Sequence, residues 1–150
     1  MTQSLLQQVE KDLIDAMKSG QTEKTSVLRM LKSSLKNAEI SKKPQELSSD
    51  DAIKVVRSEI KKRKESVEEY KKANRTELAD REEKEAEYLK AYLPPEMDAE
   101  KLEEIVRAKI QQTHSSGPSD FGKVMGAVMK DLGNAADGQT VGAVVKKLLN

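Results

Sequence analysis

The chain has 150 residues, of which 35% are charged and only 3% aromatic, and its formal net charge is +1. This length suits one domain or a domain with a small appendage, and the composition is typical of long solvated helices rather than a β-sandwich or barrel. Because there is no cysteine, disulfides and cysteine-ligated zinc or iron sites are excluded, and a reducing cytoplasm is the expected location.

Membrane association is not expected from this sequence. The N-terminal residues lack the continuous apolar core of a signal peptide. No stretch of the chain approaches the apolar length that a bilayer-spanning helix needs. Together with the composition, this predicts an all-α protein that does not enter a membrane.

Four helices are predicted in the first part of the chain. The first covers residues 4–19, and the second begins near Thr22 and ends before Pro44. An S-x-x-D capping signature at residues 48–51 opens the third helix, and residues 75–92 form the fourth. The last two helices have thin apolar stripes and many charges, so we expect them to run long and form a hairpin that projects beyond the core.

Apolar side chains at three- and four-residue spacing mark the buried face of each of these helices. The positions expected in the core of this part are Leu6, Val9, Leu13, Met17, Val27, Leu28, Leu31, Leu35, Ala38, Ile53, Val56, Ile60, Val67, Tyr70, Leu78, Tyr88, Leu89 and Tyr92. The pattern predicts an N-terminal four-helix part with a long helical hairpin.

A proline pair, Pro94-Pro95, interrupts the helices, because proline cannot continue a helix interior. We place the domain boundary here, with a helical N-terminal domain over residues 1–93 and a small three-helix bundle over residues 94–150. A domain of about 57 residues is near the lower limit for a core that is stable alone.

Three short helices are predicted after the boundary. The first begins after Asp98 and ends by Gly117, the second is capped by Ser119 or Asp120, and the third is capped by Asp137. Methionine and aromatic side chains at helical spacing indicate a core rather than a cofactor site, so no cofactor is expected. The expected core of this part is Phe121, Met125, Val128, Val144 and Leu148.

A short phrase occurs twice near the C-terminus, as GAVMK at residues 126–130 and GAVVK at residues 142–146. Each copy places a glycine inside a helix, which costs about 1 kcal/mol relative to alanine. Gly126 is predicted to lie about 140° from the apolar face of its helix, with Lys123 and Lys130 nearly opposite that face. A surface with few side chains beside lysines suits the close approach of a phosphate.

A second interpretation of these glycines is helix packing. Gly122 and Gly126, four residues apart, could let another helix pack closely, with the lysines serving only solubility. In the second copy, Gly142 lies at the edge of the apolar stripe and Lys146 lies beyond it. Spacing alone favours the packing interpretation over nucleic-acid binding.

The small net charge hides an uneven distribution. The net charge is +5 over residues 1–64, −7 over residues 65–104 and +3 over residues 105–150. Most of these charges are interpreted as solvated helix faces with ion pairs between successive turns.

The densest basic run, Lys61–Lys64, lies within a helix and is flanked by Glu59 and Glu65. This setting favours a solvated face over a localisation signal, and a contact with an RNA backbone is the weaker alternative. Stacking on single-stranded bases is disfavoured, because Phe121 is expected to be buried and only three tyrosines are present.

Catalytic motifs are lacking in this sequence. His114, the only histidine, follows a predicted helix and has no acidic residue within several positions, so a capping role is favoured. Glu82, Glu83, Glu85 and Glu87 alternate with basic residues, as on a solvated helix. There is no nucleophile elbow, phosphate-binding glycine loop or Glu-x-x-His pair for a metal. An independent enzyme is not expected.

Three segments resemble the GatB/YqeY family, specifically a free-standing YqeY-like protein. They are VLRMLKSSLKNAEI at 27–40, EIKKRKESVEEYKKANRTELADREEKEAEYLKAYLP at 59–94, and DFGKVMGAVMKDLGNAADGQTVGAVVKKLL at 120–149. The most specific parts are the Tyr-Leu-Pro joint at 92–94, the Gly-Lys-Val-Met-Gly block at 122–126 and the Ala-Asp-Gly block at 136–138.

This resemblance implies a relation to the C-terminal tail of the GatB subunit of the glutamine-dependent aminoacyl-tRNA amidotransferase. That enzyme is a carbon–nitrogen ligase with glutamine as amido-N-donor; its tail helps to hold tRNA, whereas transamidation belongs to domains that this sequence lacks. A free-standing member is therefore expected to keep a tRNA-facing surface without amidotransferase activity. The surface corresponds to residues 122–126 and 137–145.

The leading hypothesis is a non-catalytic tRNA-binding or amidotransferase-related accessory protein. The residues expected to contact phosphate are Lys123, Lys130, Lys146 and Lys147, with Gly122, Gly126 and Gly142 permitting approach. One alternative is a protein-interaction module that docks on a synthetase or amidotransferase subunit, because charges segregate in the helices between residues 50 and 92. Another is an activity related to carbon–nitrogen ligases, by family label only.

Overall fold

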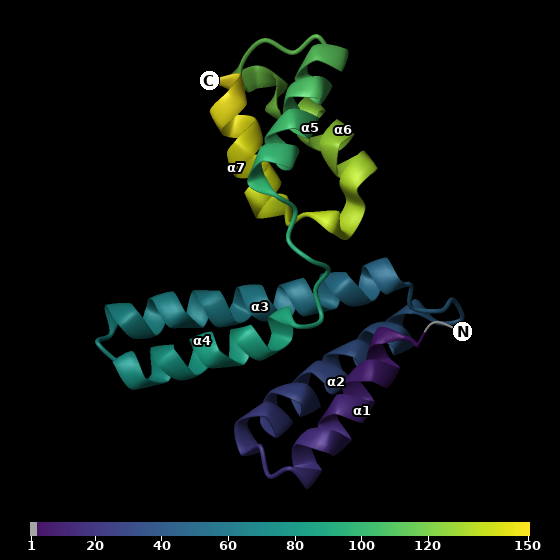
Figure 1. Cartoon of the computed structure of the whole chain (residues 1–150), viewed down its shortest axis with the longest axis vertical. Helices are drawn as coiled ribbons and strands as arrows, with labels where there is room; N and C mark the ends of the chain where they lie inside the picture. The colour runs from purple at the N-terminus through teal and green to yellow at the C-terminus, as the bar shows by residue number, and fades with distance from the viewer. Residues whose placement is uncertain (1–2) are drawn as a thin grey trace. The chain divides into compact units, whose positions relative to one another are not determined.

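The computed structural model describes residues 3–150, and these contain seven α-helices, two short 3-10 helices and no strand. The all-α prediction is confirmed. The chain divides into two compact units, one ending at Leu93 and the other comprising Pro94–Asn150 (Figure 1). Each unit has its own buried core.

The first unit consists of two helical hairpins. Helix α1 (Leu5–Lys18) packs along α2 (Thr22–Lys42), and α3 (Ser49–Lys72) packs along α4 (Thr76–Lys90) (Figure 1). Helix α2 also contacts α3 and α4, which joins the hairpins. The longest helix, α3, therefore has one face against its neighbours and the opposite face in solvent.

Local signals in the sequence define the ends of these helices. The Ser48 hydroxyl accepts a hydrogen bond from the Asp51 N–H at 3.1 Å, which confirms the predicted cap of α3. Ser4 and Gln7 form a reciprocal capping box at the start of α1, which the sequence analysis did not identify. Gly20 follows α1 with φ of +71°, a conformation that glycine adopts without strain.

Most predicted positions lie in the core of the first unit, but Ala38, Ile53, Tyr70 and Leu78 are only partly buried outside it, and α1 shows a clear error. Met17 was expected inside but is 52% exposed. The buried positions of α1 are Val9, Leu13 and Ala16, so the contact face is centred one position further round the helix. The remaining buried apolar residues of this core are Val27, Leu28, Leu31, Leu35, Ala52, Val56, Ile60, Ala86 and Leu89.

A buried ionic cluster links α2, α3 and α4. Arg63, only 5% exposed, donates to the Glu59 carboxylate at 3.0 Å and to the Glu85 carboxylate at 3.3 Å. The Ser34 hydroxyl donates to the second oxygen of Glu59 at 3.0 Å. Arg63 and Glu59 therefore belong to the interior, although the sequence places them in an apparently solvated charge run.

The second unit contains three α-helices: α5 (Ala99–Gln112), α6 (Phe121–Leu132) and α7 (Gly138–Leu149). Short 3-10 turns at Pro118–Asp120 and Gly133–Ala135 precede and follow α6. The buried core consists of Leu102, Val106, Val124, Val128, Ala136, Val141, Val145 and Leu149.

Side-chain capping in this unit differs in part from the prediction. The Asp98 carboxylate caps α5 by accepting from the Glu100 N–H at 3.1 Å, as predicted. Asp120 and Asp137 precede α6 and α7, but neither side chain makes a capping bond. The Asp120 carboxylate instead accepts from the Ser116 N–H at 3.0 Å, which holds the preceding loop.

The expected burial of Phe121 is wrong, because its side chain is 38% exposed. Of the five residues expected in this core, Val128 is fully buried, and Met125, Val144 and Leu148 are only partly buried against it. Phe121 is the first residue of α6, and helical side chains lean towards the N-terminus. Its ring therefore extends past the start of the helix, where fewer residues can cover it.

Candidate nucleic-acid interface

One exposed face of α6 carries two of the predicted lysines and a glycine. Lys123 and Lys130 are seven residues apart, nearly two full turns, so they lie on the same side of the helix. Gly126 lies between them on that side, and all three residues are exposed. This α6 face, defined by Lys123, Gly126 and Lys130, lies opposite the buried side of the helix.

Packing within the second unit does not account for the glycines of α6. A methyl group built at Gly122 or Gly126 would meet no other atom of this unit within 4 Å. The helix therefore accepts two residues of poor helix propensity without gaining a closer contact within the unit. The backbone of α6 is open to an external molecule at both positions.

Gly142 lies in a different setting. A methyl group built there would be 3.7 Å from Cζ of Phe121 and 4.0 Å from Cε of Met125. These are ordinary contact distances, and they place Gly142 at the contact between α6 and α7. The repeated phrase therefore has an open glycine in its first copy and a packed glycine in its second.

The four predicted lysines do not all lie on one face. Lys123 lies on the same side of α6 as Lys130, but its ammonium donates to the carbonyl of Thr113, just after α5, at 2.6 Å. Lys146 and Lys147 are exposed, but consecutive residues on α7 diverge by about 100°. Glu103 of α5 has a lowered pKa, first because Arg107 donates a hydrogen bond to it and then because of the positive charge of Lys147. Lys147 therefore lies near α5.

The α6 face keeps its positive charge, because the acidic residue next to it is paired with a lysine of another helix. The carboxylate of Asp131, the neighbour of Lys130, is paired with the Lys109 ammonium at 2.5 Å. Lys130 makes no ion pair with any described residue. The acidic side chains of the unit are concentrated before and within α5, whereas residues 121–150 carry four lysines and two aspartates. Helix α5 itself has no net charge, because three basic residues balance its three glutamates, whereas α6 and α7 are both basic.

Phe121 is a candidate contact residue that the sequence analysis missed. Its exposed ring adjoins Gly142 on α7 and precedes the open Gly122. Because Phe121 is 38% exposed, burial of its ring does not exclude stacking on a base. Its position at the first turn of a helix was the signal that could have indicated exposure.

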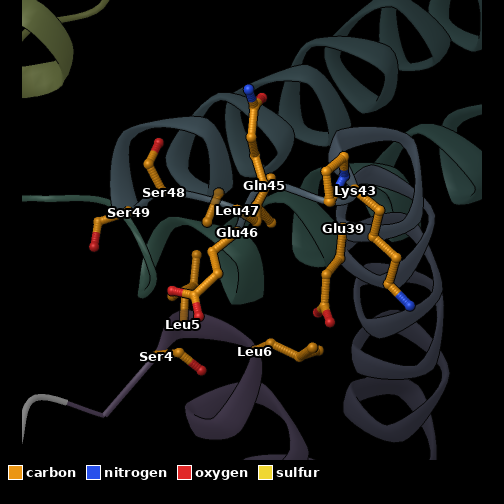
Figure 2. Close-up of a pocket in the computed structure, with 12 residues that line it drawn as sticks. Ser4, Leu5, Leu6, Glu39, Lys43, Gln45, Glu46, Leu47, Ser48 and Ser49 are labelled. Atoms are coloured by element: carbon orange, nitrogen blue, oxygen red, sulfur yellow. The ribbon is translucent and has the colours of Figure 1, made fainter.

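The first unit contains a separate cavity of about 330 Å³ between the start of α1, the end of α2 and the loop leading to α3 (Figure 2). Leu5, Leu6 and Leu47 supply apolar lining, and Figure 2 shows the carboxylate ends of Glu39 and Glu46 on the side of Leu6 and Leu5. The cavity contains no predicted site residue. Its lining comes from three separate segments, so no local motif could have indicated it.

Residues considered for catalysis are dispersed or structural. His114 is exposed and follows α5 with φ of +53°. Glu85 is held by Arg63, and burial followed by the charge of Glu85 raises the pKa of Glu82. In residues 3–150, no group of three or more histidine or carboxylate side chains is arranged to hold a metal ion.

None of the helices in the described part of the chain is long and apolar enough to cross a bilayer.

Comparison with known families identifies one match over nearly the whole chain. The family model described as Yqey-like protein matches residues 6–149. A comparison with curated proteins gives no significant match. The resemblance noted in the sequence is therefore confirmed at the level of the family.

Proposed function

Because the chain belongs to the YqeY-like family, we propose that it is a non-catalytic accessory protein that binds RNA, with tRNA as its ligand. The observation that carries this proposal is the α6 face, where Gly126 has no packing partner in its unit. Exposed lysines on the same helix supply positive charge beside this open backbone. This combination suits a phosphate backbone that comes close to a helix.

Recognition on the α6 face would depend on shape and charge. Lys123 and Lys130 are separated by about 10 Å along the helix axis, so they can neutralise different phosphates of one strand. Gly126 between them leaves room for the sugar–phosphate chain. Folded RNA is recognised largely through its shape and backbone, which fits a surface with few groups for reading bases.

The remaining predicted residues contribute differently to this proposal. Lys146 has no ion pair among the described residues and adds positive charge on α7. Lys147 lies near Glu103, so it is expected to contribute less. The exposed ring of Phe121 offers an aromatic surface for a base.

The proposed role is to hold or present tRNA in the cytoplasm for an enzyme that acts on it, such as a synthetase or amidotransferase. The protein itself would perform no transamidation. Docking on a subunit of such an enzyme without RNA is the alternative, and the experiment below separates it from RNA binding.

The direct test is a titration of the full chain against tRNA at several salt concentrations. We expect binding at low salt, and we expect the double variant K123Q/K130Q to make the log–log salt slope shallower by about 1.5. The double variant K11Q/K18Q, which removes the same charge from α1, is the matched control and should bind like the unchanged protein.

Two results would contradict this proposal. The first is an absence of tRNA binding at low salt. The second is recovery of a protein partner from cell extract in an amount that nuclease treatment does not reduce, together with K123Q/K130Q binding tRNA normally. The second result would instead support the protein-docking alternative.

A further inference from the structure

We propose that the first unit carries a second RNA-binding surface, on the exposed side of α3. This α3 basic face is defined by Lys54, Lys61 and Lys64. The inference rests on the proposed function in that its ligand is RNA, but it places a contact in the first unit, whereas the α6 face belongs to the second. The ligand of the α3 basic face is the phosphate backbone of a folded RNA.

The three lysines share one side of α3. Lys54 and Lys61 are seven residues apart, and Lys64 follows three residues later, so their directions fall within an arc of about 80°. All three are exposed, and none forms an ion pair with a described residue. The face extends about 15 Å along the axis, a length over which one strand of a duplex presents several phosphates.

Burial of the ionic cluster leaves the net charge of this surface unchanged but removes the carboxylate that the sequence places among its lysines. Glu59 is 8% exposed and is held by Arg63 and Ser34, and within the run Lys61–Lys64 it also pairs with the Lys62 ammonium, at 3.4 Å. The interior removes one negative and one positive charge from the surface. Residues 52–64 present no exposed carboxylate, and exposed acidic residues, Asp50 and Glu68, lie on the same side of α3 just beyond the two ends of the face.

The composition of the face favours RNA over an anionic membrane. A helix that lies on a bilayer needs a large apolar side to insert between lipids. The apolar side of α3 is buried inside the first unit, at Val56, Ile60 and Val67. The large apolar side chains that are exposed in the described chain lie on α1, α2 and α6, and none lies on α3. The exposed side of α3 therefore offers charged side chains without large apolar ones, which suits contacts with phosphates.

The experiment compares three variants of the full chain for binding to fluorescent tRNA between about 50 and 200 mM salt, the range in which phosphate contacts are most easily resolved. K54Q/K61Q/K64Q removes the α3 basic face. K11Q/K18Q/K43Q is the matched control, because it removes three other exposed lysines that form no ion pair with a described residue. K123Q/K130Q reports on the α6 face, and thermal unfolding by circular dichroism verifies that every variant folds.

We expect K54Q/K61Q/K64Q to weaken binding at 50 mM salt by about tenfold and to make the salt slope shallower by about two units. The matched control should change affinity by less than about twofold, because it lowers net charge without removing phosphate contacts. Loss of affinity in both the α3 and the α6 variants supports both surfaces.

The inference is overturned if K54Q/K61Q/K64Q binds tRNA like its matched control. If K123Q/K130Q then still loses affinity, the proposed function stands without a contact on α3. If only the α3 variant loses affinity, the α3 surface stands and the α6 face is wrong. Binding to phosphatidylserine vesicles that requires the three lysines, without binding to tRNA, would overturn the inference in favour of a membrane.

Discussion

The stability of its own unit does not explain why residue 126 is a glycine. It lies in the middle of α6, where alanine would favour the helix by about 1 kcal/mol, and no neighbour in its unit requires its small size. The glycine therefore lowers the stability of the unit without a packing gain. Such a position is a candidate for selection by an external partner.

We expect Gly126→Ala to raise the thermal stability of the full chain, because the added methyl group meets only open space in its unit and improves helix propensity by about 1 kcal/mol. Gly126→Gln should also stabilise the helix but weaken tRNA binding by about tenfold, because its side chain occupies the approach path. Melting temperature and affinity are measured for both variants.

The control for this prediction is Ala108→Gln, which adds similar bulk to an exposed position on α5. It should leave the affinity for tRNA unchanged. A loss of stability in Gly126→Ala would indicate a packing role for the glycine. Normal binding by Gly126→Gln would show that no RNA approaches α6 closely at this position.

At the scale of secondary-structure elements, charge serves two purposes in the α3–α4 hairpin. Exposed lysines keep one side of α3 in solvent, whereas Glu59, Arg63 and Glu85 tie α3 to α2 and α4 from within. A buried ion pair adds little compared with a well-packed apolar pair, but removing one partner is costly because the other charge is left buried. The cluster therefore makes the hairpin sensitive to single substitutions.

We expect Arg63→Met to lower the free energy of unfolding by about 3 kcal/mol at neutral pH, because Glu59 loses its principal partner in a buried site. The matched control is Arg81→Met, which removes a 63% exposed arginine lying 3.6 Å from Glu85 and should cost less than about 1 kcal/mol. Urea unfolding measures both changes. Equal effects would contradict the structural role of the cluster.

The buried pair of Arg63 and Glu59 also predicts that the stability of the protein depends on pH. Burial alone would raise the pKa of Glu59, but hydrogen bonds from Arg63 and Ser34 oppose burial and hold it below its ordinary value of 4.5. A lowered pKa in the folded state contributes stability above pH 4.5, and this contribution is lost as the pH falls through the folded-state pKa. Arg63→Met should therefore differ less from the unchanged protein in acid, and a constant difference would contradict this assignment.

At the scale of the whole molecule, the chain consists of two units with separate cores on either side of Pro94. Tyr92, near the end of the first unit, donates a hydrogen bond to Asp12 of α1 at 2.6 Å, so the chain is anchored just before the boundary. Burial and this bond raise the pKa of Tyr92 above its ordinary range. The proposed RNA contacts draw on both units.

We expect residues 1–93 to fold cooperatively without the rest of the chain, because most of their buried apolar residues form one cluster within that segment. Residues 94–150 should also be helical but only marginally stable, since about 57 residues bury a small core. Circular dichroism and thermal unfolding of the two fragments, compared with the full chain, measure this. Loss of cooperative unfolding in residues 1–93 would contradict the proposed domain boundary.

Much of the fold could be predicted from local patterns in the sequence. Apolar spacing predicted each α-helix, and the caps at Ser48 and Asp98 formed as expected, because a capping bond involves residues only a few positions apart. Family membership also followed from motifs such as the block at residues 122–126. These features depend on neighbours in sequence, so the sequence determines them by itself.

Only the tertiary structure decided which side chains face the interior where local patterns were ambiguous. Phe121 and Met17 fit an apolar stripe yet are exposed, whereas Glu59 and Arg63 fit a solvated charge run yet are buried. In each case the outcome depends on which neighbouring helices cover that side chain, and these helices are distant in sequence. The same reason explains why Gly126 is open and Gly142 is packed, although both occur in nearly the same phrase.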